Sequence, residues 1–112
     1  MEIKTTPWGN PTWKEEILEG IFVVSTSSHG GICISKEVAK DKLSIPAREC
    51  AILHEDFYCF EEDCDWAIPF YEIEELQATL ELDEKTTAKE YLENSLNYWN
   101  KSYMSKIIKE KL

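Results

Sequence analysis

The chain has 112 residues, of which 43% are hydrophobic and 30% are charged, and its formal net charge is −10. We expect a single compact acidic domain over residues 1–112, because this length and apolar content exclude a collagen-like or wholly disordered chain. No apolar run approaches the roughly 20 residues that cross a bilayer, and the first residues lack the apolar stretch of a signal peptide. A cytosolic protein is therefore expected.

The N-terminal third contains signals for one helix and one hairpin. Asn10 and Pro11 are residue types that begin helices, so they predict a short helix over residues 11–18 that Gly20 ends. Residues 21–26 and 32–34 are rich in β-branched side chains and are joined by a glycine-containing turn. These two segments predict an antiparallel β-hairpin.

The middle of the chain contains two further helix starts. Ser35 can cap a helix over residues 36–43, and Ser44 with Pro46 can open another. Apolar residues at helical spacing extend that second helix; they are Cys50, Leu53, Phe57 and Phe60. Because residues 57–60 are also strongly strand-prone, a strand at that position is the alternative.

The C-terminal half is expected to be helical. The acidic residues 61–63 favour a helix N-terminus, and Pro69 should interrupt or kink the helix that follows. Thr87 and Glu90 match a capping box and predict a basic helix over about residues 86–109. Its apolar stripe consists of Leu92, Leu96, Trp99, Tyr103 and Ile107. The expected fold class is α+β, with a small antiparallel hairpin or sheet packed against several helices and a long amphipathic C-terminal helix.

The charge is distributed very unevenly along the chain. Residues 1–48 are neutral, residues 49–84 hold thirteen acidic residues without a lysine or arginine, and residues 85–112 carry a net charge of +3. An acidic block of this kind repels nucleic acid and attracts basic protein surfaces, although it can also serve only as a solvated surface. The predicted partner-binding residues are Glu55, Asp56, Glu61, Glu62, Asp63, Asp65, Glu72, Glu74 and Glu75.

Two sets of cysteine and histidine residues offer alternative chemistry. Cys50, His54, Cys59 and Cys64 are spaced by four or five residues, but they lack the CxxC spacing of a zinc knuckle. His29 and Cys33 flank the hairpin turn, where glycine backbone could supply an oxyanion hole. No third residue to orient the imidazole is evident. We therefore predict no catalytic residue, no metal site and no cofactor.

Two segments resemble a known group of domains. Residues 25–32 (STSSHGGI) and 61–68 (EEDCDWAI), preceded by Trp8-Gly9, resemble a family of small uncharacterised domains found in proteins of phages, plasmids and other mobile elements. The resemblance covers about residues 8–75 and departs from the family pattern after Ile68, at Pro69. It implies no known activity or site residues.

Together, the acidity and the resemblance suggest an inhibitor of a host defence nuclease. A CRISPR effector or restriction enzyme grips nucleic acid in a basic channel, which closely spaced carboxylates could occupy without catalysis. One alternative is a Cys/His enzyme or zinc-stabilised domain using His29, Cys33, His54 and Cys64. Another is a regulatory protein-interaction module that docks through its C-terminal helix.

Overall fold

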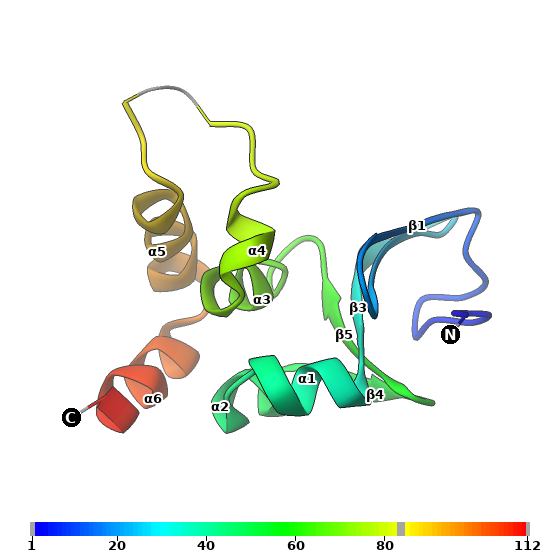
Figure 1. Cartoon of the computed structure of the whole chain (residues 1–112), viewed down its shortest axis with the longest axis horizontal. Coiled ribbons are helices and arrows are strands. Elements are labelled where there is room, and N and C mark those ends of the chain that lie inside the picture. The colour runs from blue at the N-terminus through cyan, green and yellow to red at the C-terminus, as the bar shows by residue number, and fades with distance from the viewer. Residues whose placement is uncertain (1, 83–84, 112) are drawn as a thin grey trace.

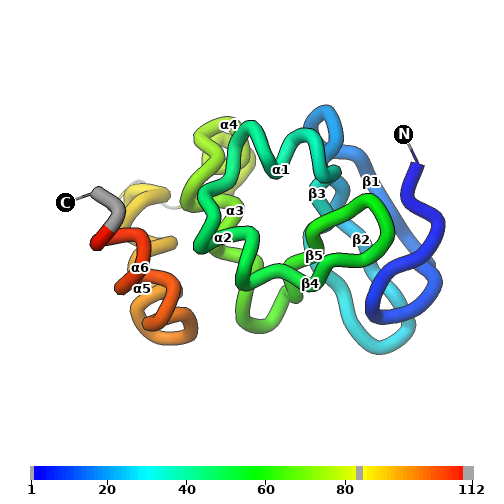
Figure 2. Tube along the Cα trace, turned by 90° about the horizontal axis from the view of Figure 1, so that it is seen from below, coloured from blue at the N-terminus to red at the C-terminus, as the bar shows by residue number. Residues whose placement is uncertain are grey.

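The computed structural model describes residues 2–82 and 85–111, the last two by their backbone alone. Within these residues it has a five-stranded antiparallel sheet and six helices, which confirms the predicted α+β class. The molecule measures 38 × 31 × 24 Å. The sheet and the N-terminus lie at one end of its long axis, and the last two helices lie at the other (Figures 1 and 2).

The sheet has the spatial order β1-β2-β3-β5-β4, so β1 and β4 form its edges. The strands are β1 (Trp13–Leu18), β2 (Ile21–Ser25), β3 (Gly30–Ser35), β4 (Ile52–His54) and β5 (Phe57–Glu61). The predicted hairpin is confirmed as β2 and β3, whose register pairs Ile21 with Ile34 and Ser25 with Gly30. Strand β5 then pairs antiparallel with β3 at the centre of the sheet.

Two helices lie between β3 and β4, and the other four follow β5. They are α1 (Lys36–Lys42), α2 (Ile45–Cys50), α3 (Ala67–Glu72), α4 (Glu74–Gln77), α5 (Ala88–Trp99) and α6 (Lys101–Lys111). Ser35, Ser44 and Thr87 each accept a hydrogen bond from a backbone N–H in the first helical turn, which confirms all three as N-caps. Among the described residues, no helix is long and apolar enough to cross a membrane.

The helix predicted over residues 11–18 is wrong, because this segment forms the edge strand β1. Trp13 to Glu16 are all exposed, so no apolar helical face is available for burial. Pairing with β2 instead satisfies the backbone, and Gly20, with a φ of 75°, makes the turn between the two strands. A charged edge strand also discourages pairing with other chains.

The helix opened by Ser44 ends earlier than predicted, at Cys50. Residues 51–60 do not continue it, so the proposed helical face of Cys50, Leu53, Phe57 and Phe60 is wrong. The alternative is confirmed, because residues 57–60 lie in β5 and pair with β3. Glu55, with a φ of 54°, lies in the turn between β4 and β5.

Two predictions about the later helices also need correction. Residues 61–63 do not begin a helix; α3 starts at Ala67, and Pro69 is tolerated within its first turn because that position needs no backbone donor. The single C-terminal helix is divided at Asn100 into α5 and α6. Trp99 is 59% exposed and packs edge-on against Tyr98, whereas the other four residues of the predicted stripe are buried.

The two faces of the sheet are covered differently. One face, including Ile32, Ile34 and Phe60, packs against the helices in the larger core. The other face is covered by the N-terminal segment, whose Ile3 and Trp8 pack in a smaller cluster with strand residues. The sheet is therefore buried on both sides over much of its centre, and β3 is buried along its whole length.

Glu72 connects three helices on the larger core side. Its carboxylate accepts hydrogen bonds from the backbone N–H and hydroxyl of Ser44, both at 2.6 Å, and from the Tyr103 hydroxyl. Ser44 is the N-cap of α2, Glu72 ends α3, and Tyr103 is buried in α6. This carboxylate therefore fixes the mutual positions of α2, α3 and α6.

Tyr103 makes stability sensitive to alkaline pH. Burial and the hydrogen bond to Glu72 raise the pKa of Tyr103 well above its ordinary value of 10.0. Above about pH 10 the unfolded chain releases this proton while the folded chain keeps it, so the free energy of unfolding falls as pH rises. Urea unfolding of wild type and Tyr103→Phe should be compared from pH 9 to 11. The free energy of unfolding should fall more steeply with pH for wild type, and the difference in slope should approach that expected for about one proton. Parallel pH profiles would contradict this prediction.

Candidate functional site

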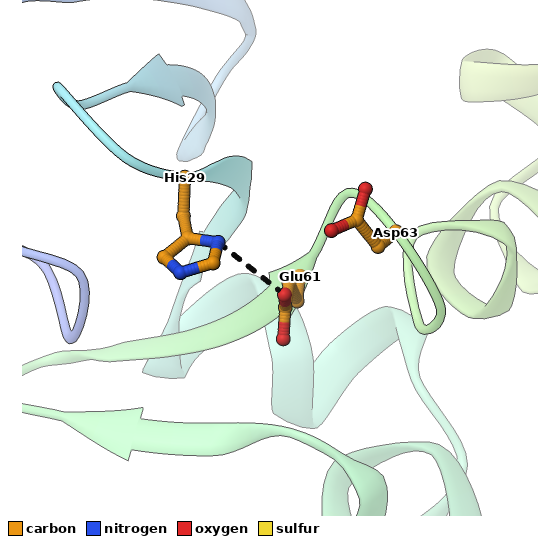
Figure 3. A group of neighbouring side chains, drawn as sticks. All are labelled: His29, Glu61 and Asp63. Carbon is orange, nitrogen blue, oxygen red and sulfur yellow. Dashed lines mark ion pairs between the residues drawn. The ribbon is translucent and has the colours of Figure 1, made fainter.

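The two segments that carry the family resemblance meet at one end of the sheet. Residues 29–31 and 61–66 are far apart in sequence, but β3 and β5 pair so that Gly31 lies opposite Glu61. The backbone N–H of Glu62 donates to the carbonyl oxygen of Gly30 at 3.0 Å, extending the pairing beyond the strand end. The loop before β3 and the turn after β5 therefore lie side by side, with His29 facing Glu61 (Figure 3).

Both glycines are needed for this close approach. A Cβ atom on Gly31 would lie 2.2 Å from the carbonyl oxygen of Phe60 and 2.5 Å from the ring of Trp8. At Gly30, a Cβ atom would lie 2.9 Å from both the Glu62 carboxylate and the carbonyl oxygen of Val24. The glycines therefore have a packing role, and the Glu62 carboxylate lies over the backbone of Gly30.

His29 lies beside two carboxylates at this junction. Its Nδ1 atom is 3.6 Å from an Oε atom of Glu61, and one ligand atom from each of His29, Glu61 and Asp63 lies within 4.8 Å of the others (Figure 3). One imidazole nitrogen and two carboxylate oxygens are ligands that Zn²⁺ or Mn²⁺ accepts. The same geometry gives a protonated His29 an ion pair with Glu61, which requires no metal.

The turn after β5 is a concentrated source of negative charge. Glu61, Glu62, Asp63 and Asp65 place four carboxylates within five residues. Asp65 accepts a hydrogen bond from the Asn100 side chain at 2.9 Å, which holds the turn against the break between α5 and α6. In the part of the chain that the structure describes, the salt bridges of lysine residues involve other acidic groups, and none reaches this turn. We call residues 61–65 the acidic turn.

A crevice of about 250 Å³ opens beside the acidic turn, between the sheet and α3. It is lined by Val23, Val24, Ser25, Gly31, Ile32, Glu62, Trp66 and Phe70. The rings of Trp66 and Phe70 meet edge-to-face with their centroids 5.6 Å apart, and Trp66 also contacts the ring of Tyr91. The crevice thus combines apolar and aromatic walls with one carboxylate.

The other predicted partner-binding residues do not join this surface. Glu55 and Asp56 lie in the turn at the opposite end of β5, roughly 16 Å away along the strand. Asp56 pairs with Lys36, at 3.9 Å. The carboxylate of Glu72 is engaged inside the fold, as described above. Of the predicted set, the structure brings together only the members within the acidic turn.

The acidic residues of α4 lie apart from the acidic turn as well. Glu74 is exposed in the first turn of this helix. Glu75 forms a 3.1 Å salt bridge with Lys42, and this hydrogen-bonded contact lowers the pKa of Glu75. Its charge is therefore already compensated within the chain.

The cysteine residues of the two predicted sets lie in different surroundings. Cys33 and Cys59 lie opposite each other in the buried sheet, and contact with Cys59 and burial raise the pKa of Cys33. Nucleophilic and zinc-binding cysteines require the opposite shift. His54 is hydrogen-bonded to Thr5 at 2.8 Å.

Cys50 and Cys64 do not complete either predicted set. Burial is the main reason that the pKa of each thiol is raised. Within the described residues, the single convergent group of three potential ligands is the one formed by His29, Glu61 and Asp63. Neither predicted set of cysteines and histidines converges.

Sequence reasoning missed the crevice. Trp66 is half-buried, packs against the larger core and also lines the wall of the crevice. Val23 in β2 pairs with Ile32 in β3, and these two residues form the floor of the crevice. The predicted hairpin is therefore the signal that could have placed them together. Phe70 could be placed there only once the start of α3 was known.

Comparison with known proteins identifies a family. The family model described as "Domain of unknown function (DUF7007)" matches residues 1–112. No curated protein and no solved structure gives a significant match to the chain. Because the family match spans the whole sequence, the protein belongs to the DUF7007 family.

Proposed function

We propose that this protein is a non-catalytic inhibitor that binds the basic nucleic-acid-binding surface of another protein. The proposed target is a bacterial host defence nuclease, such as a CRISPR effector or a restriction enzyme, in the host cytosol. The acidic turn makes the principal contact. Its carboxylates bind the lysine and arginine side chains that otherwise hold phosphate groups.

The observation that carries this proposal is that, among the described residues, no lysine or arginine salt bridge compensates the charge of the acidic turn. Double-stranded DNA presents one negative charge per roughly 1.7 Å of helix axis, so a protein that replaces it needs closely spaced anions. Four carboxylates in five residues, without a lysine or arginine salt bridge among the described residues, meet that need. The rigid strand end that carries Glu61 also reduces the entropy lost on binding.

The raised thiol pKa values and dispersed cysteines support binding over covalent catalysis. In the proposed mechanism the inhibitor blocks its target by steric exclusion and by charge, and no bond is made or broken. Association should accelerate at low salt, because complementary potentials steer the two proteins together.

The proposal is tested by capture from a bacterial lysate treated with nuclease, which removes bridging nucleic acid. The site variant is Glu61→Gln with Glu62→Gln and Asp63→Asn. The control variant is Glu19→Gln with Glu37→Gln and Asp41→Asn, since these residues line a different crevice at the opposite end of the sheet. Both variants change the net charge equally.

Wild type and the control variant are expected to capture the same nucleic-acid-binding protein, and the site variant is expected to lose it. Circular dichroism checks that all three proteins are folded. Equal capture by the two variants would mean that the acidic turn is only a solvated surface. Capture of no nucleic-acid-binding protein by wild type would overturn the proposed function.

A further inference from the structure

We propose that the crevice beside the acidic turn receives an arginine side chain of the basic partner. This inference rests on the proposed function and specifies how the same site would recognise its partner. The proposed contacts are an ion pair with Glu62, stacking against Trp66, and apolar contact with the floor formed by Val23 and Ile32.

The walls of the crevice match the two parts of an arginine side chain. Arginine has an apolar stem and a planar cation, so it can bury its stem against apolar groups while its guanidinium contacts a carboxylate. Val23 and Ile32 supply the apolar surface, and the Glu62 carboxylate supplies the charge. The ring of Trp66 adds a cation–π contact, which is strongest for tryptophan among the aromatic residues.

Size and charge disfavour drug-sized, anionic and metal-ion occupants. The volume of about 250 Å³ is below the roughly 300–1,000 Å³ of sites for drug-sized ligands, so it suits one side chain. Glu62 and the neighbouring acidic turn repel phosphate and carboxylate ligands. The apolar floor offers no oxygen ligands to a hydrated metal ion.

The neighbouring carboxylates add a second, outer layer of recognition. Glu61 and Asp63 flank Glu62 on the acidic turn; Asp63 is exposed to further basic groups of the partner, and Glu61 is half-buried beside His29. A buried arginine anchor surrounded by weaker polar contacts is the usual arrangement of an interface hot spot. The crevice would therefore supply specificity, and the acidic turn would supply attraction.

The probe is the peptide acetyl-Gly-Arg-Gly-amide, compared with the same peptide containing citrulline, a neutral analogue of arginine. Binding is followed by two-dimensional ¹⁵N NMR through the indole N–H of Trp66 and the amide of Gly31. The Trp66 indole signal is assigned with Trp66→Phe. We expect a saturable shift of both signals with the arginine peptide and none with the citrulline peptide.

Glu62→Gln tests the ion pair and is nearly isosteric, so the fold should be retained. It should weaken binding of the arginine peptide about tenfold, whereas Glu74→Gln on α4 should leave binding unchanged. Absence of a saturable shift at the crevice, or equal binding by Glu62→Gln and wild type, would overturn the inference.

The outcomes separate this inference from the proposed function. If the arginine peptide leaves the crevice signals unmoved while the site variant still loses the captured partner, the crevice inference fails and the proposed function stands. If no basic partner is captured, the proposed function fails whatever the peptide shows. A saturable shift of the crevice signals with the arginine peptide would then establish only a binding site for a cationic side chain.

Discussion

Replacing Gly31 by alanine is expected to lower the free energy of unfolding by about 3 kcal/mol. The added methyl group would lie 2.2 Å from the carbonyl oxygen of Phe60, and backbone cannot move aside cheaply at the centre of a paired sheet. It would also strike the Trp8 ring at 2.5 Å, and so displace the N-terminal segment from its face of the sheet.

Urea unfolding monitored by circular dichroism measures this loss of stability. The control is Ser28→Ala in the preceding loop, where the side chain is exposed and the free energy of unfolding should change by less than about 0.5 kcal/mol. A Gly31→Ala protein as stable as wild type would mean that the strand and Trp8 are not packed as closely as described.

Glu72→Ala is expected to lower the free energy of unfolding by a similar amount, about 3 kcal/mol. Its removal leaves the Ser44 amide and hydroxyl and the buried Tyr103 hydroxyl without their acceptor. Unmet polar groups of this kind cost about 1–3 kcal/mol each, with partial relief wherever water can enter. Because Glu72 connects α2, α3 and α6, unfolding should remain a single transition with a lower midpoint.

Glu74→Ala provides the matched control, since Glu74 is exposed two residues further along the chain. Thermal and urea unfolding should place this control close to wild type. If Glu72→Ala and Glu74→Ala were equally stable, the Glu72 carboxylate would have no structural role and would be free to contact a partner. That result would restore Glu72 to the partner-binding set.

Local signals predicted several elements correctly. Ser35, Ser44 and Thr87 are N-caps in the structure because capping depends on the few backbone groups that follow the residue. The β2–β3 hairpin was predicted for the same reason, since its strand-prone segments are joined by a short loop. The fold class followed from these elements together.

The error at residues 13–18 is local, because this segment pairs with β2 through the turn at Gly20 although Asn10 and Pro11 are typical of a helix start. The other errors arose where partners distant in sequence decide the structure. Residues 57–60 pair with β3 across an intervening α1 and α2. Asn100, where the C-terminal helix divides, donates a side-chain hydrogen bond to Asp65, 35 residues earlier. Such contacts leave no periodic pattern in the local sequence.

The candidate site was predicted in parts. Both the His29–Gly31 turn and the acidic turn were evident in the sequence, but their meeting depends on the register that places Gly31 opposite Glu61. The sequence also named nine acidic residues as partner contacts and left open whether they share one face. The structure separates them, because Glu72 and Glu75 have partners within the chain.

The most direct test of the central claim is competition between this protein and DNA for the purified captured target. The apparent Kd of the target for a DNA duplex should rise with added wild type or control variant, and should be unaffected by the variant of Glu61, Glu62 and Asp63. The inhibition should weaken between about 50 and 200 mM salt, as ion-pair contacts are screened. A ternary complex in which the target binds DNA and this protein at once, with an unchanged Kd, would contradict the account.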